Sequence, residues 1–135
     1  MAKSRGRLLA ELLSSDGNVK RTKSKDDVAA KETGTATSNA TTQKSIMTFA
    51  KADYRSAKYV IQITNSTDST YHVTELLLTH NGSIAHITEY GTVYTGAAAE
   101  AAFSADISGL NVRLLATPAS GDTMAYKVIL QTIAV

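Results

Sequence analysis

The stretch SAKYVIQITNSTDSTYHVTELLLTHNGSIAHITEYGTVYT, residues 56–95, decides the fold class of this 135-residue chain. β-Branched and aromatic residues fill it, and short polar segments interrupt it. Its first segment alternates with period two: Lys58 and Gln62 fall on one side, and Tyr59, Ile61 and Ile63 fall on the other. Because successive side chains of a strand point to opposite faces, this alternation predicts a strand with one buried face.

Asn81-Gly82 is the strongest local signal in the chain. This pair is preferred in two-residue type I′ turns, so it predicts a hairpin between residues 71–80 and 83–90. The turn would place His80 opposite Ser83, Leu78 opposite Ala85, Leu76 opposite Ile87 and Thr74 opposite Glu89.

The predicted hairpin has two unlike faces. Leu76, Leu78, Ala85 and Ile87 share one face, which we expect to line the core. Glu75, Leu77, Thr79, His86 and Thr88 share the other. Because this second face mixes apolar with polar side chains, we expect something else to cover it.

Further short strands follow the hairpin. Residues 103–108 and 112–117 flank the tight turn Gly109-Leu110-Asn111, and a last strand runs from Met124 to about Ile133. Residues 91–102 are expected to form a longer excursion, whose alanines have room for one helical turn. About six to eight strands, with turn residues between them, predict a small antiparallel β-sandwich or barrel-like domain over residues 46–135.

Residues 1–45 are expected to form a separate docking unit. Leu8, Leu9, Leu12 and Leu13 recur at helical spacing and predict a short N-terminal helix that ends near Gly17. Such a helix is marginal alone in water, so it either docks through its leucine face or frays. Residues 18–45 hold few large apolar side chains, which predicts an extended arm.

Charge is unevenly distributed along the chain. Residues 1–33 contain eight Lys and Arg against five acids, a net charge of +3, whereas residues 34–135 contain six against seven, a net charge of −1. Arg5, Arg7, Lys20 and Arg21 are therefore candidate docking cations for an acidic protein surface. The sequence argues against nucleic acid as a partner, because the total charge is +2 and Asp26 and Asp27 follow the basic run.

The sequence predicts no catalytic residue, cofactor site or metal site. It has no cysteine, no phosphate-binding glycine loop and no nucleophile motif. His80 and His86 fall on opposite faces of the hairpin, and the acids are scattered. No apolar run is long enough to span a membrane. We therefore expect a non-enzymatic protein.

The segments RSAKYVIQIT, YHVTELLLTHNGSIAHITEYGTVYTG and FSADISGLNVRLLATPA, with the final strand around Lys127-Val128, resemble a β-rich domain of virion structural proteins. These proteins occur in tailed bacteriophages, especially in phages of marine cyanobacteria. The opening SRGRLLAELLSSDGNVK is similar to the head segment of many phage fibre and appendage proteins. Leu110 departs from the pattern, which has a glycine at its place.

The resemblance implies a virion protein that docks onto other virion proteins and forms a homo-oligomer, with a trimer preferred. Capsid decoration or cementing is the leading hypothesis. The alternative is a fibre or adaptor protein of the tail or neck that contacts host-surface glycans. Loops 65–70 and 118–122 carry polar residues suited to sugars, but the same residues are ordinary turn formers.

Overall fold

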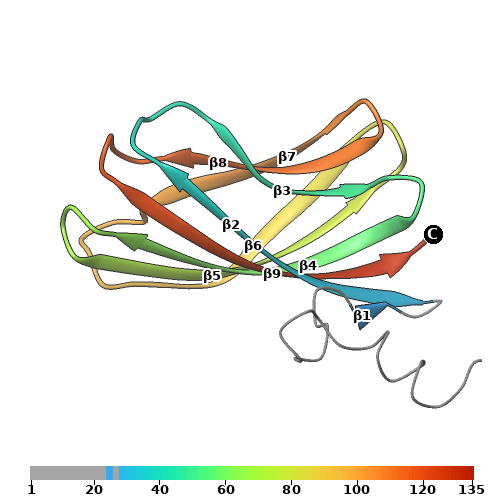
Figure 1. Ribbon diagram of the computed structural model, residues 1–135, viewed down its shortest axis with the longest axis horizontal. Coiled ribbons are helices and arrows are strands. Elements are labelled where there is room, and N and C mark those ends of the chain that lie inside the picture. Colours follow the sequence, from blue (N-terminus) through green and yellow to red (C-terminus); the bar gives the residue numbers. More distant parts are fainter. Residues whose placement is uncertain (1–23, 26–27) are drawn as a thin grey trace, which may run out of the picture.

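The computed structural model describes residues 24–25 and 28–135. In this part of the chain, strands form two antiparallel sheets that face each other (Figure 1). The larger sheet has the spatial order β1 (Ser24–Lys25), β2 (Ala29–Ser38), β9 (Met124–Ala134), β4 (Tyr54–Asn65), β5 (Thr70–His80) and β6 (Ala85–Tyr94). The smaller sheet has the order β3 (Lys44–Ala50), β8 (Asn111–Pro118) and β7 (Ala101–Ser108).

The predicted fold class, an all-β antiparallel sandwich, is confirmed. The alternation predicted for β4 is also present: Tyr59, Ile61 and Ile63 are completely buried, whereas Lys58 and Gln62 point to the opposite face. The helix predicted around residues 8–13 lies outside the described residues.

The hairpin of β5 and β6 has the predicted faces but a different register. His80 pairs with Ala85 and Leu78 pairs with Ile87, two residues further along β6 than predicted. The cause is a four-residue loop, in which Oδ1 of Asn81 accepts hydrogen bonds from the backbone N–H groups of Ser83 and Ile84 at 2.9 and 2.8 Å. Because the shift is even, the four predicted core residues still share the inner face.

Strand β6 continues beyond Gly91 to Tyr94, where the sequence predicted a longer excursion. The register of the β5–β6 pair shifts between Val73 and Glu75, and Gly91 has a φ of 64°. Glycine adopts this left-handed conformation without steric cost, so the strand passes through a bulge and resumes pairing. Residues 97–99, the alanines expected to form a helical turn, lie in the loop before β7 and are not helical.

Strand β2 lies in a segment that was predicted to be part of the extended arm. Apart from Lys31 and Glu32 its side chains are small, and Ala30, Gly34 and Ala36 lie on the inner face. It nevertheless pairs with β9 along its ten residues, so main-chain hydrogen bonds hold it in the sheet. A Cβ atom at Gly34 would lie 2.7 Å from Sδ of Met47, which shows how closely β3 packs against it.

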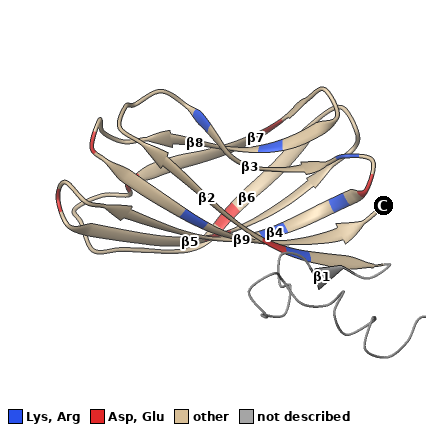
Figure 2. Ribbon diagram, viewed as in Figure 1, with Lys and Arg blue, Asp and Glu red and all other residues tan. Residues whose placement is uncertain are grey.

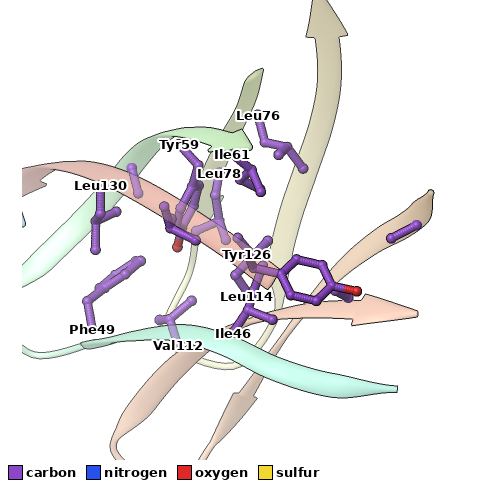
Figure 3. Close-up of a cluster of buried hydrophobic side chains, with 14 of the residues drawn as sticks. Ile46, Phe49, Tyr59, Ile61, Leu76, Leu78, Val112, Leu114, Tyr126 and Leu130 are labelled. Atoms are coloured by element: carbon purple, nitrogen blue, oxygen red, sulfur yellow. The ribbon is translucent and has the colours of Figure 1, made fainter. Parts of the chain in front are cut away.

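The core lies between the two sheets (Figure 3). The larger sheet contributes Tyr59, Ile61, Leu76, Leu78 and Leu130, and the smaller sheet contributes Ile46, Phe49, Val112 and Leu114. Complete burial of one such side chain stabilises the fold by about 1.5–3 kcal/mol.

Two of the three buried tyrosines of the core, Tyr59 and Tyr126, have unlike hydroxyl environments (Figure 3). The Tyr59 hydroxyl has no hydrogen-bond partner among the described residues, and burial raises its pKa. The Tyr126 hydroxyl lies 3.2 Å from Oγ of Ser38 and 3.7 Å from Sδ of Met124. A buried hydroxyl without a partner loses its hydration without compensation, so Tyr59 carries a cost that Tyr126 does not.

One end of the sandwich is held by Asn65, the last residue of β4. Its amide nitrogen donates to Oε2 of Glu100 at 3.0 Å and to Oδ2 of Asp122 at 2.9 Å. Its Oδ1 accepts from the backbone N–H groups of Thr67 and Asp68 at 3.0 and 3.1 Å. One amide group thus ties together three loops, and all of its hydrogen-bonding atoms are used.

His72 is part of the same end. Its Nδ1 accepts a hydrogen bond from the backbone N–H of Glu100 at 3.1 Å, and its ring contacts Tyr94 and Phe103 edge to face. Burial lowers the pKa of His72, and this effect outweighs the opposite influence of the Glu89 and Glu100 carboxylates. The native state therefore favours the neutral imidazole.

We predict that Tyr59→Phe leaves the free energy of unfolding unchanged or raises it by about 1 kcal/mol, because it removes an unsatisfied hydroxyl. Tyr126→Phe is the matched control and is expected to lower it by about 0.5–1.5 kcal/mol. Urea denaturation followed by circular dichroism measures both changes. A clear destabilisation by Tyr59→Phe would show that its hydroxyl has a partner.

We predict that stability falls as the pH drops below about 6.5, the ordinary pKa of histidine. The unfolded chain binds a proton at His72 that the native state resists, so unfolding is favoured as the pH decreases. His72→Asn keeps an acceptor for the Glu100 N–H and should flatten the slope between pH 7 and pH 5. An unchanged slope in repeated urea titrations would contradict a role for His72.

Candidate functional site

The outer face of the larger sheet is the most distinctive surface in the described part of the chain. The smaller sheet covers only its inner side (Figure 1). The strand registers arrange outward side chains in four rows across β2, β9, β4, β5 and β6, and a fifth row of Thr37, Ala125, Thr64 and Tyr71 lies beyond them. The rows are Ala29, Ile133, Ser56, Thr79, His86; Lys31, Gln131, Lys58, Leu77, Thr88; Thr33, Ile129, Val60, Glu75, Tyr90; and Thr35, Lys127, Gln62, Val73, Val93.

This outer face exposes many large apolar side chains. Leu77 is 47% exposed, Ile129 is 40% exposed and Ile133 is 56% exposed. Val73, Val93 and Tyr90 are exposed on the same face. Scattered apolar residues are ordinary on a protein surface, but neighbouring ones on a single sheet face indicate a contact surface.

Two hollows lie on the outer face. The first has a volume of about 890 Å³ and is lined by Ser56, Leu77, Thr79 and Ile133, among others. The second has a volume of about 530 Å³ and is lined by Val60, Val73 and Ile129, among others. Together the two hollows extend over all four rows, so side chains of another surface can fit into them.

The charges of the outer face are divided between its two halves. Lys31, Lys127 and Lys58 lie on β2, β9 and β4, whereas Glu75 lies on β5. Figure 2 shows the basic side chains in blue and the acidic ones in red along the strands. Lys58 Nζ is 3.5 Å from Glu75 Oε1, and both side chains are partly exposed. Such a pair contributes at most about 1 kcal/mol to stability, so these charges remain open to other partners.

The outer face of the smaller sheet has a different character. Arg113 donates to both carboxylate oxygens of Asp106, and these hydrogen bonds hold the pKa of Asp106 below its usual range. Gln43 donates to the hydroxyls of Ser104 and Thr117 at 3.0 and 3.3 Å. These polar groups form hydrogen bonds with one another. Substitutions on this face can therefore serve as controls for substitutions on the larger sheet.

Loops 65–70 and 118–122, the candidate sugar-binding loops, use their polar groups internally. Asn65 is saturated by the bonds described above, and Asp122 is one of its acceptors. Hydrogen bonds from Ser120 and then from Asn65 lower the pKa of Asp122, which favours the carboxylate form. These groups are therefore held as structural acceptors.

The histidines do not converge on a common point. Nδ1 of His80 accepts from the backbone N–H of Gly82 at 3.0 Å, and its Nε2 lies 2.7 Å from the Tyr54 carbonyl oxygen. His72 is buried at the opposite end of β5, and His86 is exposed on the outer face. Within the described ranges, no group of three or more histidines and acids has the arrangement of a metal site.

Across residues 24–25 and 28–135, the structure has no helix of the length and hydrophobicity needed to cross a membrane. The predicted docking residues all precede this part of the chain: Arg5, Arg7, Leu8, Leu9, Leu12, Leu13, Lys20 and Arg21. The docking hypothesis for them stays a prediction. The sequence predicted the outer face only in part. The mixed face of the hairpin, which contains Leu77 and Glu75, predicted that something covers this face, but it did not show that the face extends over β2, β9 and β4.

No protein-family model matches the chain, and no curated protein matches it in sequence. Several solved structures are similar to it. One is the tailspike protein gp49 of Acinetobacter baumannii bacteriophage Fri1, a capsular polysaccharide depolymerase, with a TM-score of 0.47 and 18% identity. The match covers 84% of this chain and 21% of that chain.

Two further tailspike proteins are similar. For that of Acinetobacter baumannii phage AM24, the TM-score is 0.45 and the identity 8%, over 78% of this chain and 26% of that one. For that of Acinetobacter phage vB_ApiP_P1, the TM-score is 0.43 and the identity 21%, over 78% and 22%. The chain thus spans about a quarter or less of each tailspike.

These likenesses concern the course of the backbone over part of each tailspike. At these TM-scores and identities they assign the chain neither to a family nor to a role; they do not support the cyanophage type in particular, and they give no support to capsid decoration. The prediction of a non-enzymatic protein is contradicted, because one of the neighbours is a polysaccharide depolymerase. The match covers only 21% of that depolymerase, so its activity is a property of the longer protein and is not assigned to this chain.

Proposed function

We propose that this chain is a β-sandwich module of a phage tail-associated fibre or adaptor protein, and that the outer face of its larger sheet is an assembly surface. The observation that carries the proposal is the apolar outer face, with Leu77, Ile129 and Ile133 each at least 40% exposed. Water-exposed aliphatic side chains gain about 25 cal/mol for each Å² that a partner covers.

The contrast between the two outer faces supports this assignment. The smaller sheet satisfies its outward polar groups through Arg113, Asp106 and Gln43. The larger sheet instead presents aliphatic side chains around two hollows. A module that makes contact through a single face needs this asymmetry, because the other face then stays in water.

The phage setting follows the resemblance of residues 54–133 to virion structural proteins. A tail position agrees with the tailspike proteins to which the chain is similar, and it replaces the capsid position that the sequence first favoured. The module would occur in few copies per particle, as the components of a tail do.

A second candidate function is contact with host-surface glycans. It is favoured by Tyr71 and Tyr90, which are 50% and 38% exposed on the same face of β5 and β6. Aromatic rings offer apolar surfaces for sugar rings, and their hydroxyls remain available for hydrogen bonds. The depolymerase among the similar structures acts on a capsular polysaccharide, so we take this class of glycan as the ligand to test.

For the leading proposal, we predict that gold-labelled antibodies against the chain mark the tail of the parent particle, with copy numbers in the single or low double digits by quantitative mass spectrometry. Leu77→Lys, which places a charge on the assembly surface, should reduce incorporation at least about tenfold, or about 1.4 kcal/mol. Ser104→Lys on the smaller sheet is the control. Label spread over the whole head in hundreds of copies would contradict the proposal.

For glycan contact, we predict that capsular polysaccharide of the host retards the protein in affinity electrophoresis and that Tyr90→Ala weakens this retardation about tenfold. Tyr94→Phe is a control, since it preserves the ring that packs on His72. Equal retardation of wild type and Tyr90→Ala would remove this candidate and leave the assembly function standing.

A further inference from the structure

We propose that Asn81-Gly82 is a site of self-modification, at which the backbone nitrogen of Gly82 attacks the side-chain amide of Asn81 and His80 acts as the general base. The inference is independent of the assembly surface, because it concerns only the loop between β5 and β6. Residues 80–84 bring together a nucleophile, a base and two hydrogen-bond donors for the negative charge that develops during the attack.

The nucleophile is the backbone nitrogen of Gly82. It directly follows Asn81, so its attack on the side-chain carbon Cγ closes a five-membered ring. Asn81 is the only asparagine in the sequence that is followed by glycine. Glycine has no Cβ atom to crowd the attacking nitrogen, and it adopts the φ of 94° that the loop requires without steric cost. Asn81 is exposed, so water can reach the ring that forms.

His80 lies where a base for this nitrogen is needed. The N–H of Gly82 donates a hydrogen bond to Nδ1 of His80 at 3.0 Å, within the range of about 2.6–3.2 Å that a general base requires. Nε2 of the same ring lies 2.7 Å from the carbonyl oxygen of Tyr54. Because a carbonyl oxygen only accepts, Nε2 carries the proton and Nδ1 keeps its lone pair for the N–H of Gly82.

The surrounding structure holds the base and the nucleophile in place. His80 is only 3% exposed, and its ring centroid lies 6.1 Å from that of Phe49. Nζ of Lys51 donates to the carbonyl oxygen of Gly82 at 3.3 Å, which ties the loop to the end of β3. A base that is oriented by a third group, here the carbonyl of Tyr54, is the arrangement by which proteins activate weak nucleophiles.

Two backbone donors polarise the side-chain carbonyl of Asn81. Its Oδ1 accepts hydrogen bonds from the N–H groups of Ser83 at 2.9 Å and Ile84 at 2.8 Å. Backbone donors at about 2.7–3.1 Å stabilise the oxyanion of a tetrahedral intermediate. When Cγ is attacked, negative charge develops on Oδ1, and the two donors that stabilise this charge are already in position.

The reaction balances without a cofactor. The bond between the Gly82 nitrogen and Cγ of Asn81 forms as Nδ1 of His80 takes the proton of the Gly82 amide. That proton passes to Nδ2 of Asn81 as the Cγ–Nδ2 bond breaks, which releases ammonia and leaves a succinimide. Water then opens the succinimide at either of its two carbonyl carbons. The products are an aspartate or an isoaspartate, in which the backbone runs through Cγ.

The products differ from the original loop in charge and in backbone length. One neutral amide becomes one carboxylate, so the formal net charge falls from +2 to +1. In the isoaspartate, the backbone gains one methylene group and the former side-chain carbonyl becomes a backbone carbonyl. The hydrogen bonds that Oδ1 receives from Ser83 and Ile84 must then be remade. The change runs in one direction, so it records the age of the molecule.

The first test is incubation of the full-length chain in neutral buffer, followed by tryptic digestion and fragmentation mass spectrometry that locates each modified asparagine. No Lys or Arg lies between Lys58 and Arg113, so Asn65 and Asn111 share a tryptic peptide with Asn81 and serve as internal references. We expect Asn81 to be modified at least about tenfold faster than either reference, because only Asn81 has both an unhindered nucleophile and a base.

Two comparisons isolate the contribution of His80. His80→Gln should slow the modification at least about tenfold, because it removes the general base. His86→Gln, on the outward side of the same hairpin, is the matched control and should leave the rate unchanged. Circular dichroism and thermal unfolding establish that each variant is folded. The wild type in guanidinium chloride needs no variant: unfolding separates the base from the loop and should slow the modification of Asn81 by a similar factor.

Three results would overturn the inference. The first is an Asn81 that stays intact as long as Asn65 and Asn111 do. The second is a folded His80→Gln variant that reacts as fast as the wild type or faster, because His80 would then merely restrain the loop. The third is a wild type that reacts faster in guanidinium chloride than in the native state, because the fold would then protect Asn81 from attack.

Discussion

The double pairing of β9 is the constraint on which the rest of this structure depends. This strand lies between β2 and β4 and forms a ladder with each, so Ala29 and Ile133 are neighbours although about a hundred residues separate them in the sequence. It supplies Met124, Tyr126, Val128 and Leu130 to the core and Lys127, Ile129 and Ile133 to the outer face. One register therefore sets both the interior and the contact surface, because a shift by a single residue would exchange the two sets.

Much of the fold could be predicted from local patterns, and the exceptions have physical causes. The alternation in β4 and the faces of the β5–β6 hairpin depend only on period two, so they were right. The predicted register of that hairpin was wrong, because Oδ1 of Asn81 accepts two backbone hydrogen bonds that form a four-residue loop. Strand β2 was not predicted, because main-chain hydrogen bonds to β9 hold it in the sheet. Its small side chains give no sequence pattern that indicates this pairing.

The candidate site was harder to predict than the fold, because it exists only after five strands have been brought into register. Leu77 and Glu75 could be assigned to an outward face from the hairpin alone, but their neighbours Ile129, Lys127 and Lys31 come from distant segments. The reverse holds for loops 65–70 and 118–122. Their polar residues suggested ligand binding, whereas the structure uses Asn65 and Asp122 to join the loops at one end of the sandwich.

The central position of β9 also governs how the chain is made. A ribosome adds about 5–20 residues per second, so β2 and β4 emerge several seconds before the strand that must pair with both of them. During this interval each presents an unpaired edge, and on a polysome the edges of neighbouring nascent chains are close together. The threonine-rich β2 has a low tendency to pair with a strand of another nascent chain. Strand β4, which contains Tyr59, Ile61 and Ile63, has a high tendency to do so. Synthesis rate and holdase chaperones should therefore decide the yield of correctly folded protein more than the stability of the finished sandwich does.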